Sequence, residues 1–209
     1  MSNYNELNLT TWNRKEHFEF FCKFEEPFFG TTIQLDCTKA HAKSKELGVS
    51  FFAYYLHKTL VAVNNIENFR YRIHNGKVFI YDKINVSSTI LRDDKTFGFS
   101  EIEYYENLNT FIENYNTEAT RVKNTTGLFT RDYNENIVHF SALPWINFTS
   151  ISHSRSFTFP DSCPKFSFGK MTTENDKKFM SMSVHVHHGL VDGYHLGLFF
   201  EEFERLMNE

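Results

Sequence analysis

The 209 residues suit a single domain, since one hydrophobic core can still be filled at roughly 200 residues. Hydrophobic residues make up 41% and aromatic residues 17% of the chain, a composition that excludes disorder as the main state. The 22 Lys and Arg residues against 26 Asp and Glu residues leave a net charge of −4. This balance excludes a globally basic nucleic-acid binder, because phosphate neutralisation needs a surplus of cations.

Neither membrane insertion nor secretion is predicted. No apolar run approaches the roughly 18 residues that span a bilayer, and the opening MSNYNELN lacks the basic and apolar regions of a signal peptide. The three cysteines are odd in number and no CxxC pair occurs, which argues against a disulfide scaffold or a zinc ribbon. We therefore expect a cytoplasmic protein.

The first half of the chain mixes helix and strand signals. The expected elements are a helix near 12–23, a strand at 31–37, a short helix at 38–48, a buried helix at 51–66, and strands at 69–74 and 77–82. Thr10 or Thr11 can cap the first helix. Asn75-Gly76 lies between two strand-like runs and predicts a β-hairpin, because both turn positions need a positive φ.

The second half ends in the clearest pattern. The expected elements are strands at 85–91 and 96–103, a helix near 105–121, strands at 137–143, 146–152, 165–172 and 178–188, and a helix at 194–207. No regular βαβ rhythm and no linker occur, so we predict one domain over 1–209 with an α+β fold. Its architecture is a two-layer α/β sandwich, in which helices pack on a mixed, largely antiparallel sheet.

The segment His187–Gly193, HHGLVDG, is the first candidate for catalysis. A histidine where a strand runs into a loop can present its ring to a cleft while the strand holds its backbone. Imidazole is largely neutral at cellular pH and can accept a proton. Asp192 lies four residues after His188 and can orient a ring or pair with an arginine. The pattern is short, and ten histidines in the chain leave a chance occurrence open.

Metal binding is an alternative interpretation of the same segment. His185 and His187 share one face of the strand, and Asp192 and His195 are near in sequence. Zinc takes three or four such ligands. Two histidines at positions i and i+2 are more often ordinary surface or core residues.

Ser141, in the run SALPW that ends at Trp145, can donate a hydrogen bond to a developing oxyanion, or it can be a plain turn serine before proline. The nucleophile motif GxSxG is absent, as are GxGxxG and the P-loop, which argues against the common hydrolase, dinucleotide and nucleotide sites. A late basic cluster either meets a phosphorylated ligand or is solvated; it consists of Lys165, Lys170, Lys177 and Lys178.

Five stretches together carry a resemblance to a known family. They are 12–18 (WNRKEHF), 69–82 with its Phe-Arg, Asn-Gly and Tyr-Asp pairs, 141–145 (SALPW), 168–170 (FGK) and 186–195 (VHHGLVDGYH). In this order and spacing, the chain resembles the chloramphenicol acetyltransferase family along nearly its whole length. The HxxxD pattern alone is shared with other acyltransferases, including the dihydrolipoamide acyltransferase cores.

The resemblance implies transfer of an acetyl group from acetyl-CoA, as co-substrate, to a hydroxyl of chloramphenicol, through a ternary complex and without a metal. It implies that His188 is the general base, that Ser141 bonds the oxyanion, and that Asp192 pairs with Arg14 to support the loop. It further implies a homotrimer with active sites at the subunit interfaces.

The same resemblance assigns binding residues. Phe21, Glu25 and Phe29 fall at acceptor-pocket positions, and Ser167 falls where the family holds an active-site water. Trp145 and Lys170 are expected to contact the cofactor.

Glu25 stands where an apolar residue is usual, Ala53 replaces a proline, and 151–154 departs from the family pattern. These departures keep open an alternative, the same chemistry on another small hydroxylated acceptor. A non-catalytic binding module on the same scaffold is a third hypothesis.

Overall fold

The computed structural model describes residues 3–156 and 160–209. Its helices are α1 (Lys15–Phe21), α2 (Thr38–Glu46), α3 (Phe51–Asn65), α4 (Leu108–Lys123) and α5 (Gly193–Met207), with a 3-10 turn at Glu67–Arg70. Its strands are β1 (Tyr4–Glu6), β2 (Phe28–Asp36), β3 (Tyr71–His74), β4 (Lys77–Tyr81), β5 (Asn85–Leu91), β6 (Phe97–Phe99), β7 (Ile137–Ala142), β8 (Lys165–Phe168), β9 (Thr172–Glu174) and β10 (Lys177–His187).

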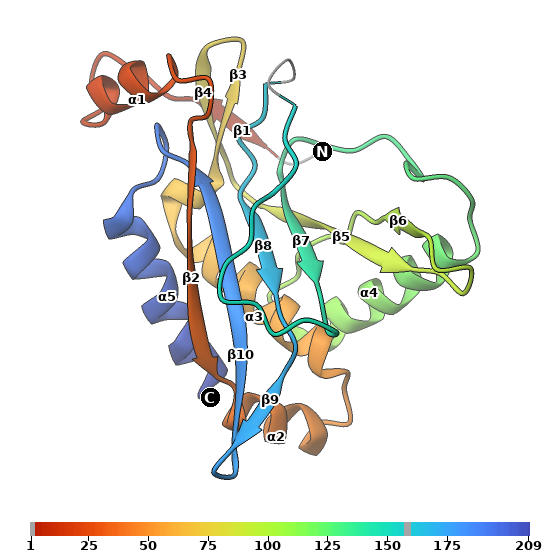
Figure 1. Ribbon diagram of the computed structural model, residues 1–209. Coiled ribbons are helices and arrows are strands. Elements are labelled where there is room, and N and C mark those ends of the chain that lie inside the picture. The colour runs from red at the N-terminus through yellow and green to blue at the C-terminus, as the bar shows by residue number, and fades with distance from the viewer. Residues whose placement is uncertain (1–2, 157–159) are drawn as a thin grey trace.

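The main sheet has the order β2-β10-β8-β7-β5-β6, with β9 paired to β10 (Figure 1). β5, β7 and β8 run parallel to one another, and the remaining pairs are antiparallel. β1, β4 and β3 form a small second sheet. The predicted α+β class with a mixed, largely antiparallel sheet is therefore confirmed. No helix of the described residues is long and apolar enough to cross a membrane.

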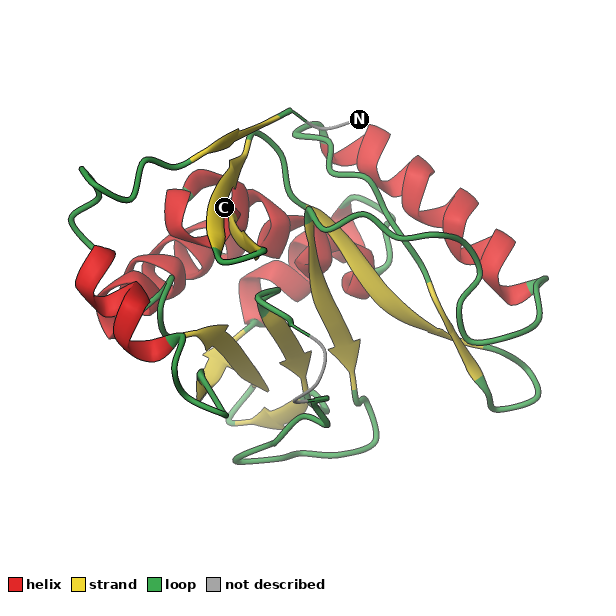
Figure 2. Cartoon of the chain, turned by 90° about the horizontal axis from the view of Figure 1, so that it is seen from above, coloured by secondary structure: helices red, strands yellow, loops and turns green. Residues whose placement is uncertain are grey.

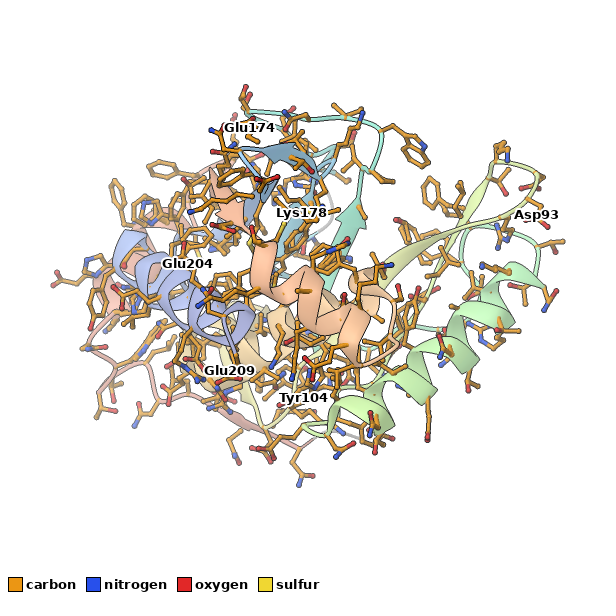
Figure 3. All side chains as sticks on the ribbon, turned by 90° about the horizontal axis from the view of Figure 1, so that it is seen from below. Asp93, Tyr104, Glu174, Lys178, Glu204 and Glu209 are labelled. Carbon is orange, nitrogen blue, oxygen red and sulfur yellow. The ribbon has the colours of Figure 1, made fainter. Side chains whose placement is uncertain are left out.

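One face of the main sheet is apolar and packs on helices, which gather on one side of the sheet in Figure 2. Phe140 of β7 and Phe168 of β8 contact Tyr55 of α3, and Phe166 of β8 contacts Phe199 of α5. These five side chains are at most 5% exposed. α5 is amphipathic: its other face carries Glu204, labelled in Figure 3, which is exposed to solvent.

The opposite face of the sheet is polar, and this face carries the candidate site. Side chains alternate along each strand, so residues paired across strands share a face. Two rows of paired residues cross this face. The first row consists of Ser87, His139, Lys165 and His185. The second row, two residues further along β7, consists of Ser141, Ser167 and Ser183. After β7, the described residues 143–156 cross this face (Figure 1).

The structure of this segment contradicts one prediction. Residues 146–152 were expected to form a strand, but they form a turn and loop. The Ile146 amide donates to the Leu143 carbonyl, which closes a turn after Pro144, and the Phe148 carbonyl accepts a bond from the Ser181 hydroxyl. The segment thus lies over β10 and does not pair beside a strand, although its side chains alternate.

Several further boundaries differ from the prediction. β2 starts earlier than expected, at Phe28, and β6 covers only Phe97–Phe99 of the expected 96–103. Phe69 and Arg70, expected at the start of a strand, lie in the 3-10 turn before β3.

The first helix starts only at Lys15, because Asn8 binds the backbone and hydroxyl of Thr10 and closes a separate turn before it. The strand expected at 165–172 divides at Gly169, where a Cβ atom would lie 3.1 Å from the Ile146 carbonyl. The Asn75-Gly76 hairpin is confirmed, with φ of 50° and 73°.

Candidate active site

The loop after β10 is held rigidly at both ends. His187, the last residue of β10, is 5% exposed, and its Nδ1 accepts a hydrogen bond from the Gly189 amide at 3.1 Å. A Cβ atom on Gly189 would lie 3.1 Å from the His187 ring, so glycine allows this close approach. Asp192 then caps α5, as its carboxylate accepts from the Tyr194 and His195 amides. The backbone around His188 is therefore fixed by a strand and a capped helix.

The His188 ring lies between two aromatic side chains. It stacks on Phe21 of α1 with centroids 3.8 Å apart and an 8° angle, and it contacts Phe29 of β2 at 4.3 Å. The His188 amide donates to the Pro27 carbonyl at 2.8 Å. Nδ1 is buried and has no hydrogen-bond partner among the described residues. The ring thus has one orientation, with Nε2 as the nitrogen that a substrate can reach.

Arg14 and Asp192 form an ion pair behind this ring. Nη1 of Arg14 lies 2.5 Å from Oδ2 of Asp192, and Arg14 is only 8% exposed. Although burial raises it, the pKa of Asp192 is lowered to about 2, because Arg14 donates to the carboxylate and His195 adds positive charge. The carboxylate therefore stays ionised near neutral pH and ties the start of α1 to the loop.

We expect Asp192→Asn to lower the free energy of unfolding by about 2 kcal/mol, because it leaves the buried Arg14 cation without a charged partner. Asparagine still caps a helix, so this change isolates the charge from the cap. Adding Arg14→Leu should recover part of that loss, since no unpaired cation then remains. Urea unfolding of both singles and the double measures the coupling. Losses that simply add would contradict the pairing.

Ser141 and Ser167 lie side by side on the polar face of the sheet. They are register partners on β7 and β8. Ser141 is half-buried and its hydroxyl makes no hydrogen bond to a described residue, so it is free to donate. Ser167 is fully buried, and its hydroxyl has no described partner. A buried hydroxyl without a partner is a place for a water molecule or a ligand atom.

Ser141 and His188 lie far apart within one chain. Ser141 pairs with Ser167 and Ser167 with Ser183, and His188 lies five residues beyond Ser183. At about 3.3 Å per residue and about 4.8 Å per strand, the separation is about 19 Å. An oxyanion donor and a general base must both lie within about 3 Å of the reacting atoms. One chain alone cannot bring these two residues to one substrate.

The other predicted binding residues divide between these two places. Phe21 and Phe29 contact His188, whereas Trp145 and Lys170 lie near the Ser141 end of β7, where the Lys170 amide donates to the Ile146 carbonyl at 2.8 Å. Glu25 is exposed at the rim of a cavity of about 570 Å³ that His187 also lines. Its carboxylate is thus solvated, and in this chain it bears no burial cost against aromatic rings.

The residues of the alternative metal site do not come together around one point; they are His185, His187, Asp192 and His195. His195 is hydrogen-bonded to Asp192, and His185 lies against His153 with ring centroids 4.7 Å apart. Among the described residues, the metal-type group that does converge is a different one, His139, Asp161 and Cys163, within 4.8 Å. Lys165 already binds Asp161 there, and its charge opposes a second cation. Lys165 is 7% exposed, so it does not belong to the surface cluster proposed from the sequence.

The sequence patterns did not point to two polar residues of this face, His139 and Ser87. His139 and Ser87 line a cavity of about 350 Å³ on the polar face, and His139 lies two residues before Ser141 on the same strand. Period-two alternation along β7 could have linked His139 to Ser141, but the cavity itself depends on the distant loop that carries Phe129 and Tyr133.

Solved structures define the class of protein to which this fold belongs. A chloramphenicol acetyltransferase superposes with a TM-score of 0.91 at 29% identity, covering 99% of this chain and 100% of that one. A probable dihydrolipoamide acetyltransferase from Listeria monocytogenes superposes with a TM-score of 0.66 at 13% identity, covering 96% of this chain and 92% of that one. This second likeness shows a shared fold. The chain is thus built as an acyltransferase.

Sequence comparisons identify the family within that class. The family model described as chloramphenicol acetyltransferase matches residues 2–204. A chloramphenicol acetyltransferase of Proteus mirabilis is 30% identical over 97% of this chain and 94% of its own, and one of Staphylococcus aureus is 28% identical over 98% and 99%. The chain belongs to the chloramphenicol acetyltransferase family, as the motifs predicted.

Proposed function

We propose that this protein transfers the acetyl group of acetyl-CoA to a hydroxyl of chloramphenicol and so inactivates the antibiotic. Nε2 of His188 takes the proton of the acceptor hydroxyl as its oxygen bonds to the thioester carbonyl carbon. The carbonyl oxygen becomes a tetrahedral oxyanion, to which the Ser141 hydroxyl donates. When the intermediate collapses, the C–S bond breaks, and the CoA sulfur takes the proton from the His188 imidazolium.

One observation carries this proposal: the His188 ring has a single orientation between Phe21 and Phe29, on a loop that the Arg14–Asp192 pair supports. A general base needs that fixed direction, because proton transfer depends on hydrogen-bond geometry. Asp192 is bonded to Arg14 and α5, so its role is to position the loop and not to relay charge.

The active site combines two copies of the chain in this proposal. The roughly 19 Å between Ser141 and His188 is bridged if His188 of one copy faces Ser141 of its neighbour. A homotrimer of single-domain chains, as the family resemblance implies, would contain three such sites. Each site then takes Phe21, Glu25 and Phe29 from one copy and Ser141 and Ser167 from the next.

Acetyl-CoA is proposed to bind beside Ser141. Trp145 is 69% exposed and offers a flat indole face, and Lys170 is an exposed cation suited to a phosphate group. Ser167 would hold a water molecule in the acceptor site, in keeping with its unpartnered hydroxyl. All three cysteines are free, which is consistent with the reducing cytoplasm that we propose as its location.

Incubation of the purified protein with acetyl-CoA and chloramphenicol tests the activity. We expect release of free CoA thiol, followed with a thiol reagent, and a product heavier by one acetyl group in mass analysis. A panel of other hydroxylated compounds should react more slowly. Rapid thiol release with one of these, and none with chloramphenicol, would favour the alternative acceptor that the exposed Glu25 carboxylate allows.

A further inference from the structure

His195, in the first turn of α5, holds the side of Asp192 that Arg14 does not reach. Its Nδ1 lies 2.7 Å from Oδ1 of Asp192, whereas Nη1 of Arg14 binds the other oxygen, Oδ2. The His195 side chain is only 14% exposed, so little water competes for this contact. The carboxylate is therefore gripped at both oxygens by side chains from two different parts of the chain.

The charge of Asp192 decides where the proton of His195 lies. With a pKa of about 2, Asp192 is ionised near neutral pH, and its oxygens can only accept hydrogen bonds. A contact of 2.7 Å to Nδ1 then requires a proton on that nitrogen. The Asp192 amide lies 3.3 Å from the same nitrogen, but a protonated Nδ1 cannot accept from it. His195 is thus fixed as the Nδ1–H tautomer.

Histidine suits this position better than the residues that are usual there. Glutamate or glutamine is common at the third position of a capped helix, but a glutamate at 195 would repel the Asp192 carboxylate. Neutral imidazole supplies a donor instead. With the amides of Tyr194 and His195 also donating to Oδ1, the carboxylate receives four hydrogen bonds, about as many as its lone pairs accept. Asp192 therefore has one orientation.

That orientation reaches the general base through Arg14. Nη2 of Arg14 donates to the His188 carbonyl at 3.5 Å, while its Nη1 is bound to Asp192. We propose that His195 is a positioning residue of the catalytic loop (188–191), because its Nδ1–H fixes the Asp192 carboxylate. Through Arg14, that carboxylate then holds the backbone of His188. This inference rests on the proposed function, in which the loop carries the general base.

The first test compares His195→Leu, which removes the donor, with His195→Asn, whose side-chain amide can donate from the position of Nδ1. We expect His195→Leu to lower kcat about tenfold, the loss of roughly one net hydrogen bond to a charged group. The KM values for acetyl-CoA and chloramphenicol should change less than about twofold. His195→Asn should recover most of the loss. His74→Leu, the same change at an exposed histidine of the β3–β4 hairpin, is the matched control.

A second test uses the charge that His195 can carry. The charged groups that face it are Asp192 from the loop and Arg14 from the turn before α1, and the Tyr194 ring lies 5.5 Å away. Burial lowers the pKa of His195 and Arg14 lowers it further, although Asp192 raises it, so the ring is neutral at cellular pH. In Arg14→Leu that cation is gone, and we expect the pKa of His195 to rise.

In Arg14→Leu the protonated ring should then replace Arg14 as the counter-charge of Asp192. The measurement is the kcat of Arg14→Leu divided by that of Arg14→Leu/His195→Asn at each pH, which cancels the titration of His188. Asparagine keeps the hydrogen bond but cannot be charged, so this ratio should rise about threefold or more between about pH 8 and about pH 6. A ratio independent of pH would contradict the contact between the imidazole and the carboxylate.

The outcomes separate this inference from the proposed function. If the wild-type protein does not acetylate chloramphenicol, the proposed function fails, and urea unfolding still tests His195. Stability losses of Arg14→Leu and His195→Leu that simply add would overturn its role, because both residues are proposed to hold one carboxylate. If the wild-type protein is active and His195→Leu keeps its kcat within about twofold, only the role of His195 is wrong. A His195→Asn variant as impaired as His195→Leu would also overturn that role, since it would indicate a packing defect.

Discussion

Replacing His188 with alanine is expected to lower kcat at least about 10³-fold while the chain remains folded, because a positioned general base contributes roughly 10² to 10⁴ to the rate. Without the imidazole, no described side chain on that loop can take the proton of the acceptor, since Asp192 is bonded to Arg14 and His187 accepts from the Gly189 amide. The measurement is steady-state CoA release at saturating acetyl-CoA and acceptor.

Folding must be checked beside activity, because the His188 ring stacks on Phe21. We expect loss of this contact to lower the free energy of unfolding by only about 1 kcal/mol, which circular dichroism and urea unfolding can measure. His17→Ala on the exposed side of α1 is a suitable control and should retain activity. If His188→Ala kept a kcat within tenfold of the wild type, His188 would not be the base.

Two variants that are each inactive, His188→Ala and Ser141→Ala, are expected to regain activity when their subunits are mixed. If each site takes His188 from one copy and Ser141 from the next, a mixed oligomer contains sites in which both residues are intact. Random mixing in equal amounts makes about one quarter of the sites intact, since each of the two required subunits is present with a chance of about one half.

Co-expression of the two variants with different affinity tags, followed by purification through both tags, gives the mixed oligomer directly. We expect thiol release at about a quarter of the wild-type rate per site or higher, because the two tags select against pure oligomers. Each variant alone sets the baseline. Mixed oligomers that stay at this baseline would mean that Ser141 and His188 do not meet across an interface.

Local patterns in the sequence were sufficient for the parts of the fold that depend on neighbouring residues. Asn75-Gly76 predicted its hairpin, since only positive φ values close that turn. The alternation of 178–188 predicted β10, and the apolar run at 51–66 predicted the buried α3. The strand predicted at 146–152 was wrong because alternation is a local pattern. It indicates an extended chain but does not indicate whether a free strand edge is there to pair with it.

The amino-acid sequence by itself determined the chemistry of this protein: the HxxxD loop, the SALPW serine and the arginine near the N-terminus appear in family order, and the fold class follows from the helix and strand periods. Only the tertiary structure decided where these groups lie. Strand register separates Ser141 from His188 by about 19 Å, aromatic rings from α1 and β2 orient the imidazole, and a distant loop closes a cavity over His139. Periodicity assigns a side chain to a face, but register and loop packing depend on contacts between residues far apart in the chain, which no local pattern specifies.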